Sequence, residues 1–480
     1  MSATVVWFRN DLRLADHPAL TAAAERGAVV PAFVWAPDEE APWEPGGAHR
    51  WWLHESLGAL DGALRERGSR LVLRQGPSLD ELLAVCRASG ADRVVWQGRI
   101  APALRRRDEA VREALEVEGI ATEAFPGRLL HDPDEIQTGS GGPYRVFGPF
   151  WKKVRASLDP GRPLPAPDLG GAAPASWPDS VDRDALGLTP LAQDGVDWAG
   201  AMREAWAPGE AGAQARLHAF LGGPILDYPE RRDFPAAGGS SRLSPHLHWG
   251  EVSPRQVWAE ANSWVSNGVT REAADGFLFE LGWREFSYHV LHHFPHMPDE
   301  PLKEKYERMP WESDADALRA WEQGRTGYPI VDAAMRELWA LGWMHNRMRM
   351  VTASFLTKDL LVPWQDGERW FWDTLCGGDL ANNAMGWQWA AGSGADAQPF
   401  FRIFNPISQS ERYDPDGDYI RRWVPELAEL PTKHLHAPWD APPDVLEAAG
   451  VVLGETYPRP IVDHAEARDR ALAALKTVNA

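Results

Sequence analysis

The sequence predicts an α/β domain at the N-terminus and a large all-α domain after it. Between Thr4 and about His131, short runs rich in β-branched and aromatic residues, such as TVVWF and RVVWQ, alternate with helical patterns such as SLDELLAVCRASG. This alternation is typical of a parallel, Rossmann-like sheet covered by helices. No GxGxxG follows the first predicted strand, so the usual dinucleotide fingerprint is missing there.

Three regions follow from the change in composition along the 480 residues. The α/β pattern covers residues 1–131, and residues 132–207 form a connector in which DPGRPLPAPDLGGAAPASWPDS is rich in Pro and Gly. Residues 208–480 contain long amphipathic windows and no convincing period-2 strand, which predicts an all-α domain. Within EVSPRQVW, Ser253 and Gln256 predict a capping box at the start of a helix.

The composition restricts the class of protein. Hydrophobic residues at 44% and charged residues at 25% are typical of a globular chain, and no apolar run is long enough to cross a membrane. Arg9 comes too early for a secretory signal, and Cys86 and Cys376 are the only cysteines, so a reducing cytoplasm is expected. A net charge of -20 opposes a partner with a phosphate backbone unless basic residues are concentrated locally.

Two segments place polar residues where a ligand could use them. YPERRDFPAAGGSSRLSPHLHWG has small residues, hydroxyls and Arg242 just before helical text, which suits a phosphate group but also suits an ordinary capped loop. In FLFELGWREF, Glu280, Trp283 and Arg284 share one helix face. They form either an ion pair over a core indole or a ring platform beside a hydrogen-bonding acid.

The stretch ELWALGWMHNRMRMVTASFL is interpreted as one helix, with Trp339 and Trp343, then Asn346 and Met350, four residues apart. Unpaired polar groups among core-facing rings cost about 1 to 3 kcal/mol each, so these polar side chains are expected to meet a ligand. CGGDLANNAMGWQWAAG raises the same expectation, because one acid and two adjacent Asn precede two Trp separated by Gln388, and the other side chains are small or apolar.

Five segments together resemble the DNA photolyase/cryptochrome family, in the order in which that family uses them: SSRLSP, ELGWREF, GRTGYPIVDAAMRELWALGWMHNRMRM, LANNAMGWQWAAGSGADAQPFFRIFNP and IVDHAEAR. ERWFWDTL, GSGADAQPFF and LGETYPRPIVDH are most similar to bacterial class III photolyases, with class I the less similar group. The resemblance implies a U-shaped FAD in the helical domain. It also implies light-driven electron donation from reduced flavin to a flipped-out pyrimidine dimer in DNA.

The resemblance assigns two groups of residues to FAD. Those for the phosphates and the ribityl side are Tyr228, Ser240, Ser241, Arg242, Leu243 and Ser244, with Arg284 nearby. Those that line the isoalloxazine are Asn346, Arg349, Asp379 and Asn383. Asn383 matches the position that faces flavin N5, where an amide suits a flavin kept as the reduced anion.

The resemblance also assigns residues to electron transfer, to the lesion and to DNA. Trp387, Trp364 and Trp311 match the flavin-proximal, middle and surface members of the family's electron-transfer chain. The catalytic pocket for the dimer is expected to consist of Glu280, Trp283, Asn346, Met350 and Trp389. Arg232, Arg347 and Arg402 match positions near DNA phosphates, which would supply local positive charge on an acidic protein.

Within the family the cyclobutane dimer is the expected substrate. The (6-4) enzymes carry a His pair where this chain has Asn346 and Met350, and plant-type photoreceptors carry Asp where Asn383 stands. A monomeric deoxyribodipyrimidine photo-lyase is therefore predicted, with a blue-light cryptochrome that signals without repair as the alternative. Outside the family, the rival is a Trp-rich helical flavoprotein that transfers electrons without DNA.

Two departures from the family pattern concern cofactors. An antenna chromophore is expected in the N-terminal domain, with methenyltetrahydrofolate favoured and a deazaflavin as the alternative, although Leu104 occupies an acidic position of class I folate sites. Gly377 replaces the Asp that pairs in relatives with the Arg against the flavin, here Arg349. Either Asp379 pairs with Arg349 instead, or its guanidinium stays partly uncompensated. The second outcome predicts a flavin that is easier to reduce than in a Gly377→Asp variant.

Overall fold

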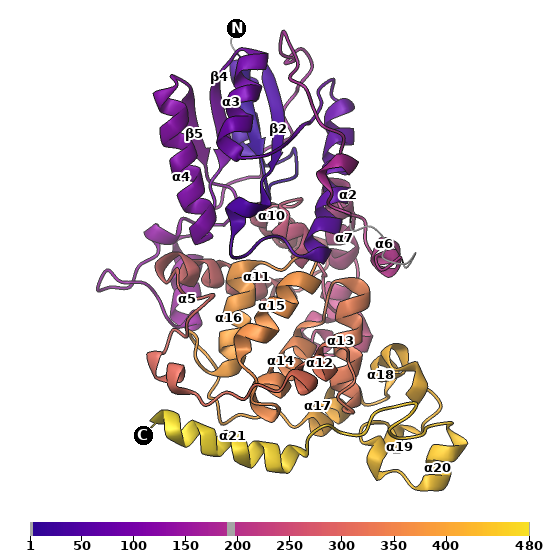
Figure 1. Ribbon diagram of the computed structural model, residues 1–480. Coiled ribbons are helices and arrows are strands. Elements are labelled where there is room, and N and C mark those ends of the chain that lie inside the picture. Colours follow the sequence, from indigo (N-terminus) through magenta and orange to yellow (C-terminus); the bar gives the residue numbers. More distant parts are fainter. Residues whose placement is uncertain (1–2, 190–196, 480) are drawn as a thin grey trace. The chain divides into compact units, whose positions relative to one another are not determined.

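A computed structural model describes residues 3–189 and 197–479 (Figure 1). The chain forms two compact units, each assembled from separate stretches. The first unit contains residues 1–223, 241–295 and 376–378, and the second contains residues 224–240, 296–375 and 379–480. In the described part of the chain, no helix is both long enough and apolar enough to cross a membrane.

The first unit is built on a parallel sheet of five strands in the order β3-β2-β1-β4-β5. The strands are β1 (Ala3–Phe8), β2 (Val29–Trp35), β3 (Val72–Gln75), β4 (Ala91–Gln97) and β5 (Ala121–Phe125). The central strands β1 and β2 are buried along their whole length, whereas the edge strand β5 is largely exposed. Continuous apolar runs at the centre are what a parallel sheet covered on both faces requires, and the predicted parallel α/β fold is confirmed.

The remaining elements of the first unit are helical. They are α1 (Pro18–Arg26), η1 (Pro37–Glu40), α2 (Gly47–Arg65), α3 (Ser78–Ser89), α4 (Pro102–Val117), η2 (Pro133–Glu135), α5 (Phe147–Ser157), η3 (Asp184–Leu186), α6 (Gly200–Ala205), α7 (Glu210–Leu221), α9 (Ser244–His248), α10 (Pro254–Trp264), η7 (Val265–Asn267) and α11 (Arg271–His293). Helices α1, α3 and α4 pack on the strands, and the apolar faces of α3 and α4 close a core that contains Trp7 and Trp96.

The Pro-rich segment that follows α5 forms backbone hydrogen bonds with strands of the same unit. The Ala172 carbonyl accepts a hydrogen bond from the Val29 amide at 2.7 Å, and the Leu73 carbonyl accepts one from the Val181 amide at 2.9 Å. The Leu164 amide donates to the Asp16 carboxylate at 3.0 Å. Part of the predicted connector, residues 190–196, lies outside the described residues, and the predicted boundaries at 131 and 207 stay predictions.

The described residues of the second unit form helices and loops, with one isolated bridge between Leu453 and Tyr457. Its elements are η5 (Pro224–Asp227), α8 (Tyr228–Arg231), η6 (Pro235–Ala237), η8 (Glu304–Arg308), α12 (Ala315–Glu322), α13 (Pro329–Leu341), α14 (Asn346–Ser354), the π-helix η9 (Phe355–Asp359), α15 (Trp364–Thr374), α16 (Leu380–Ala391), α17 (Pro406–Tyr413), α18 (Asp418–Trp423), η10 (Pro425–Leu427), α19 (Thr432–Leu435), η11 (Pro438–Asp440), α20 (Pro443–Ala448) and α21 (His464–Asn479). This confirms the predicted all-α C-terminal part.

One predicted helix boundary is confirmed, and one predicted helix is in fact two. The Ser253 hydroxyl accepts from the Gln256 amide at 2.9 Å, while the Gln256 side chain accepts from the Ser253 amide at 2.8 Å, so the predicted capping box is confirmed. The single helix expected over ELWALGWMHNRMRMVTASFL is wrong. Gly342 adopts φ 60° and ends α13, and α14 begins only at Asn346.

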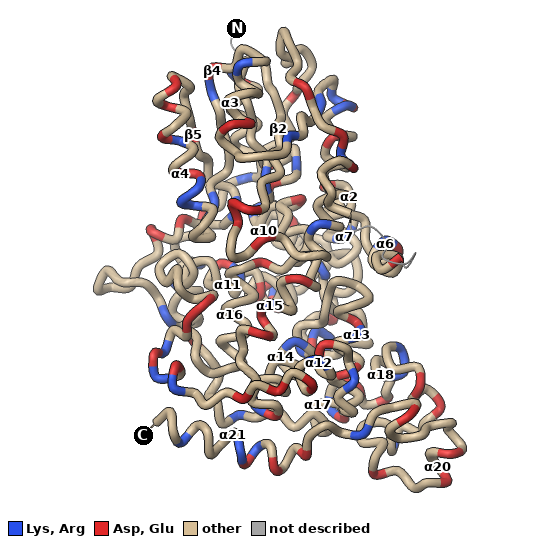
Figure 2. Tube along the Cα trace, viewed as in Figure 1, with Lys and Arg blue, Asp and Glu red and all other residues tan. Residues whose placement is uncertain are grey.

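Charged residues of both signs are interspersed along the chain, as Figure 2 shows. Basic residues therefore occur next to acidic ones even though the formal net charge is -20. The local environment of each arginine, and not the total charge, decides which ligand it can meet.

Candidate functional site

The first unit contributes an aromatic and charged face on α11. The Trp283 ring stacks on Phe147 with a centroid distance of 3.9 Å and an interplanar angle of 10°. Phe147 is the first residue of α5, and no sequence pattern had singled it out. Glu280 and Trp283 are both half-buried one helical turn apart. One ring face of Trp283 is thus fixed by Phe147, which orients the indole beside the acid.

Arg284 is a buried cation with spare hydrogen-bonding capacity. Its Nη1 donates to the Arg128 carbonyl at 3.0 Å and to the Glu285 carboxylate at 3.3 Å. Its Nη2 is buried and has no partner among the described residues. Since buried N–H groups normally find acceptors, this atom fits an oxygen of a bound ligand.

The predicted phosphate loop is divided between the two units. Tyr228 and Ser240 belong to the second unit, and Ser241, Arg242, Leu243 and Ser244 to the first. Arg242 has a φ of 54°, in the left-handed region that non-glycine residues rarely adopt, and Leu243 behind it is buried. Such strain in a loop that precedes a helix is typical of a functional segment.

In the second unit, α14 presents Asn346 and Met350 four residues apart on one helix face. Asn346 is exposed and Met350 is half-buried, so both are accessible to a ligand. Trp389 on α16 is half-buried and packs on the main helical core. All three side chains are thus at least partly accessible to a ligand, and all three belong to the second unit.

Arg349 forms no ion pair with any residue that the structure describes. Its Nε donates to the Met344 carbonyl at 2.9 Å, and burial lowers the pKa of its guanidinium to about 10, partly offset by the charge of Glu337. Asp379 instead caps α16: its carboxylate accepts from the Asn382 amide at 3.1 Å and from the Asn382 side chain at 2.7 Å. The alternative in which Asp379 pairs with Arg349 is therefore not the arrangement observed.

Gly377 has no room for a side chain. A β-carbon there would lie 2.5 Å from Pro245 Cα and 2.9 Å from the Ser244 carbonyl oxygen, all within the first unit. Backbone would have to move to accept Asp at this position. A Gly377→Asp variant would thus change the backbone as well as the charge, and it is a poor comparator for the flavin potential.

Asn383 is buried and its amide is held by the main chain. Its Nδ2 donates to the Glu368 carbonyl at 2.9 Å, which leaves its Oδ1 to meet a ligand. The Glu368 side chain is itself fully buried, and neither carboxylate oxygen has a partner among the described residues. Burial, followed by the charge of Asp299, raises the pKa of Glu368 well above its usual value, which favours the neutral form of this acid. Sequence reasoning missed it, because an acid in ERWFWDTL is typical of a solvated helix face.

The three predicted electron-transfer residues belong to the second unit and to one apolar cluster. Trp364 and Trp387 are fully buried in it, and Trp311 is partly buried against it. The Trp387 ring makes edge contacts with Trp321 at 6.0 Å and with Phe371 at 5.0 Å. Close packing of this kind holds an indole in one orientation.

Gly367 on α15 leaves the space that Trp387 occupies, since a β-carbon at Gly367 would overlap the Trp387 ring. Gly367→Ala gains about 1 kcal/mol of helix propensity but is expected to lose about 1 to 3 kcal/mol through overpacking. The free energy of unfolding should therefore fall. Gly386→Ala on α16, where nothing lies within 4 Å, should instead be neutral or stabilising. Chemical denaturation of both variants measures the difference, and equal stabilities would contradict this packing.

The three predicted DNA-contacting arginines have different surroundings. Arg347 pairs with Asp233 at 2.7 Å and lies 4.5 Å from the Tyr413 ring centroid, whereas Arg402 is exposed. Arg232 is half-buried over the ring of Tyr228. Arg402 thus has the most accessible side chain of the three, while Arg347 is already charge-paired.

Lys358 is a buried base in the π-helix, and its Nζ donates to the Arg402 carbonyl at 2.8 Å. Burial lowers the pKa of Lys358 from 10.5 to about 7, so between these values the folded chain binds fewer protons than the unfolded chain. The contribution of Lys358 to the free energy of unfolding therefore rises with pH, by up to about 1.4 kcal/mol per pH unit. Lys358→Met should be most stabilising near pH 7 and lose that advantage toward pH 10. Urea denaturation across this range, with Lys476→Met as the exposed control, checks it; a pH-independent difference would contradict a neutralised Lys358.

The first unit has a parallel α/β fold, and the helical second unit buries a Trp cluster and Asn383 and contains Arg349, which forms no ion pair among the described residues. Comparison with known proteins identifies the class as a two-unit flavoprotein. A model of DNA photolyase matches residues 4–168, and a model of the FAD binding domain of DNA photolyase matches residues 277–477. The chain belongs to the DNA photolyase family.

Individual relatives cover almost the whole chain. The deoxyribodipyrimidine photo-lyase of Agrobacterium fabrum is 48% identical over 475 residues, which are 99% of this chain and 98% of that protein. Cryptochrome-2 of Arabidopsis thaliana is 41% identical over 483 residues, 98% of this chain and 78% of that protein. The crystal structure of a bacterial class III photolyase from Agrobacterium tumefaciens aligns with a TM-score of 0.96 at 47% identity, covering 100% of this chain and 98% of that one. An archaeal photolyase from Sulfolobus tokodaii, solved with two FAD molecules, aligns with a TM-score of 0.80 at 29% identity over 99% of both chains.

Proposed function

We propose that this chain is a deoxyribodipyrimidine photo-lyase, a carbon-carbon lyase that uses light to split cyclobutane pyrimidine dimers in DNA. The observation that carries the proposal is the Asn346 and Met350 pair on one face of α14, where a proton-transferring His pair would be needed for a (6-4) lesion. The photo-lyase from Agrobacterium fabrum, at 48% identity, supports the same activity.

FAD is the cofactor, and the residues present fit it. Arg284 has a buried Nη2 with no acceptor among the described residues, and Arg349 has a guanidinium with no ion-pair partner among them, so both suit the oxygens of an anionic ligand. Tyr228, Ser240, Ser241, Arg242, Leu243 and Ser244 would hold the phosphate and ribityl portions, and Asn346, Asp379 and Asn383 would join Arg349 around the ring. When bound, reduced FAD supplies the photoexcited electron donor.

The residues of the chain have distinct tasks in this reaction. Trp283, held by Phe147, and Trp389 would provide aromatic walls for a flipped-out dimer. Glu280 would hydrogen-bond the dimer while Asn346 and Met350 pack beside it. Asn383, fixed through the Glu368 carbonyl, would present its amide oxygen to the flavin. Trp311, Trp364 and Trp387 would carry electrons inward when the flavin must be reduced.

Damaged DNA is the macromolecular partner, and Arg232, Arg347 and Arg402 would contact its phosphates. For Arg347 this requires exchange of the Asp233 carboxylate at 2.7 Å for a phosphate oxygen. Such contacts predict that binding weakens as salt concentration rises. We further propose that the protein acts as a monomer in the cytoplasm.

A second chromophore would widen the range of wavelengths that drive repair. Methenyltetrahydrofolate is favoured and a deazaflavin is the alternative; the second FAD of the Sulfolobus tokodaii photolyase supports a second chromophore in general. Leu104, buried on α4, removes the acidic group of class I folate sites, so a folate would need other partners here. Near-ultraviolet absorbance of gently purified protein separates the two chromophores.

The deciding experiment is dimer loss from ultraviolet-irradiated oligonucleotide incubated with fully reduced protein in blue light and in darkness. Repair in light alone supports the proposal. Flavin photoreduction without repair would instead indicate the cryptochrome alternative, for which the 41% identity to Cryptochrome-2 is the supporting observation. Absence of bound flavin would overturn both.

A further inference from the structure

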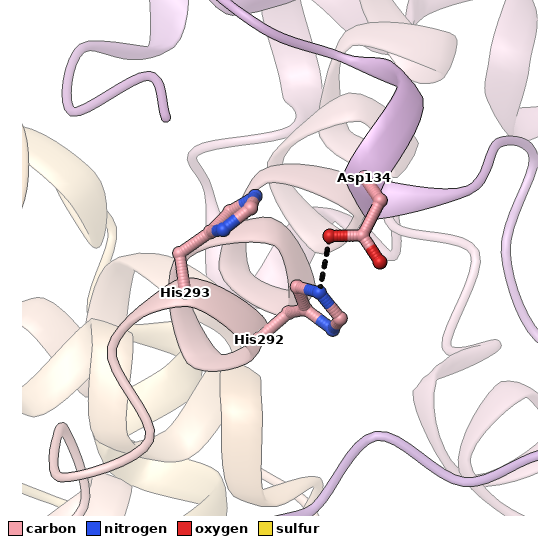
Figure 3. A group of neighbouring side chains, drawn as sticks. All are labelled: Asp134, His292 and His293. Atoms are coloured by element: carbon pink, nitrogen blue, oxygen red, sulfur yellow. Dashed lines mark hydrogen bonds and ion pairs between the residues drawn. The ribbon is translucent and has the colours of Figure 1, made fainter. Parts of the chain in front are cut away.

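A cluster of potential metal ligands lies at the C-terminal end of α11 in the first unit. Asp134, His292 and His293 each offer one ligand atom, and these three atoms lie within 4.8 Å of one another. Figure 3 shows the His292 ring directed at the Asp134 carboxylate, with His293 beside it on the same helix. Asp134 comes from η2, so the cluster joins two segments that are far apart in sequence. It is the one such group of three found among residues 3–189 and 197–479.

We propose that this cluster binds one divalent transition-metal ion, with Zn²⁺ as the best match. Two imidazole nitrogens and one carboxylate oxygen are a common three-ligand set for Zn²⁺, and a water completes the tetrahedron. In the metal-free arrangement His292 Nε2 is 2.8 Å from Asp134 Oδ1, and His293 Nε2 is 3.3 Å from the Pro133 carbonyl. On binding, the Nε2 lone pairs face the metal and the Nδ1 atoms carry the protons, so a neutral His changes tautomer and releases no proton.

The charges around the cluster favour a cation. The carboxyl end of the 23-residue helix α11 carries partial negative charge, and Asp132 and Glu135 add carboxylates on either side of Asp134. Arg105 and Arg106 line the cavity beside His292 together with Glu109 and Glu113, so these two pairs of opposite charges balance one another.

The neighbouring His289 packs against His293. Its ring centroid is 4.5 Å from that of His293, and its Nε2 accepts a hydrogen bond from the Tyr144 amide at 3.0 Å. This ring contact helps to hold the His293 imidazole in place.

An ion can reach the cluster from solvent. Asp134 is exposed, and His292 also lines a cavity of about 400 Å³ beside α4. A water on the fourth coordination position could therefore exchange. Both cysteines are buried and burial raises the pKa of each thiol, so they do not compete for the metal.

The test uses untagged, FAD-loaded protein titrated with Zn²⁺ in equilibrium dialysis and with Co²⁺ in visible absorption, where a tetrahedral site gives intense bands. One ion per chain is expected. Asp134→Asn and His293→Gln should each weaken binding at least about tenfold, while His218→Gln, a half-exposed histidine near Glu260 on other helices, should leave it unchanged. Because a ligand of the folded state stabilises it, Zn²⁺ should also raise the melting temperature of the wild type and of His218→Gln but not of the two site variants.

Either of two results would overturn the proposal. One is the absence of both zinc retention and cobalt bands in the wild type, which would leave the cluster as an ordinary His–Asp ion pair. The other is equal retention by Asp134→Asn and His293→Gln with normal FAD content, which would place the metal elsewhere. The FAD content of each variant confirms that the chain has folded.

Discussion

Trp311→Phe is expected to slow light-driven reduction of oxidised flavin at least about tenfold, while repair by chemically reduced enzyme stays within about twofold of wild type. The reason is the position of the three indoles in the second unit. Trp364 and Trp387 are each only 2% exposed, and Trp311 is partly buried, so Trp311 is the member of the proposed chain that an external donor would reach first. Phenylalanine keeps the ring packing but is much harder to oxidise than an indole. Transient absorption of the flavin after a laser pulse, with an external thiol donor, measures the change.

A second surface pair supplies the control for this prediction. Trp339 and Trp370 stack with a centroid distance of 5.9 Å and an interplanar angle of 10°, and Trp339 is 59% exposed. Trp339→Phe therefore removes a more accessible indole of the same unit. Normal photoreduction in Trp339→Phe alongside loss in Trp311→Phe supports the predicted chain. The reverse pattern would assign the entry to Trp339 and Trp370.

The fold was predictable because its signals are local. Alternation of apolar strands with amphipathic helices is enough to predict a parallel sheet, and Ser253, Pro254 and Gln256 carry the information for a helix start within four residues. Helix ends are harder to predict. The periodic pattern continues through LGWMHN, but Gly342 in the left-handed conformation ends α13. Trp339 on α13 is exposed, whereas Trp343 beyond the helix end is buried.

The sequence predicted those site residues whose side chains match the motifs of the family, such as Asn383 and Trp283. It did not predict the groups that hold these side chains in place. Phe147, which stacks on Trp283, comes from the connector, and the Glu368 carbonyl, which fixes Asn383, is a main-chain atom of another helix. Such partners are chosen by tertiary packing, so no pattern within a window of sequence can indicate them.

The sequence also did not indicate which charged side chains are buried. Lys358 and Glu368 lie in segments whose charged residues are typical of exposed helix faces, yet both side chains are fully buried. A lysine or glutamate in an amphipathic helix is normally placed on the solvated face. The π-helix at 355–359 turns Lys358 inward, and a single inserted residue of this kind has no reliable sequence signature.

Glu280→Ala should lower the quantum yield of repair by about tenfold to hundredfold. A hydrogen bond between a carboxyl group and a charged acceptor contributes about 1.5 to 3 kcal/mol, and the dimer carries negative charge only after it has received an electron. Half-buried Glu280, one turn from the fixed ring of Trp283, is placed to supply that bond. Glu280→Gln should retain part of the yield, because its amide still donates a hydrogen bond.

Glu272→Ala is the matched control, since Glu272 is an exposed acid in the first turn of the same helix. Its quantum yield should equal that of the wild type. FAD content, read from the absorption spectrum, should be unchanged in all three variants, because Glu280 is assigned to the dimer and not to the flavin. If Glu280→Ala loses FAD as well as activity, Glu280 supports the flavin site; if it repairs dimers at the wild-type yield, the acid has no part in catalysis and α11 contributes through Trp283 and Arg284 alone.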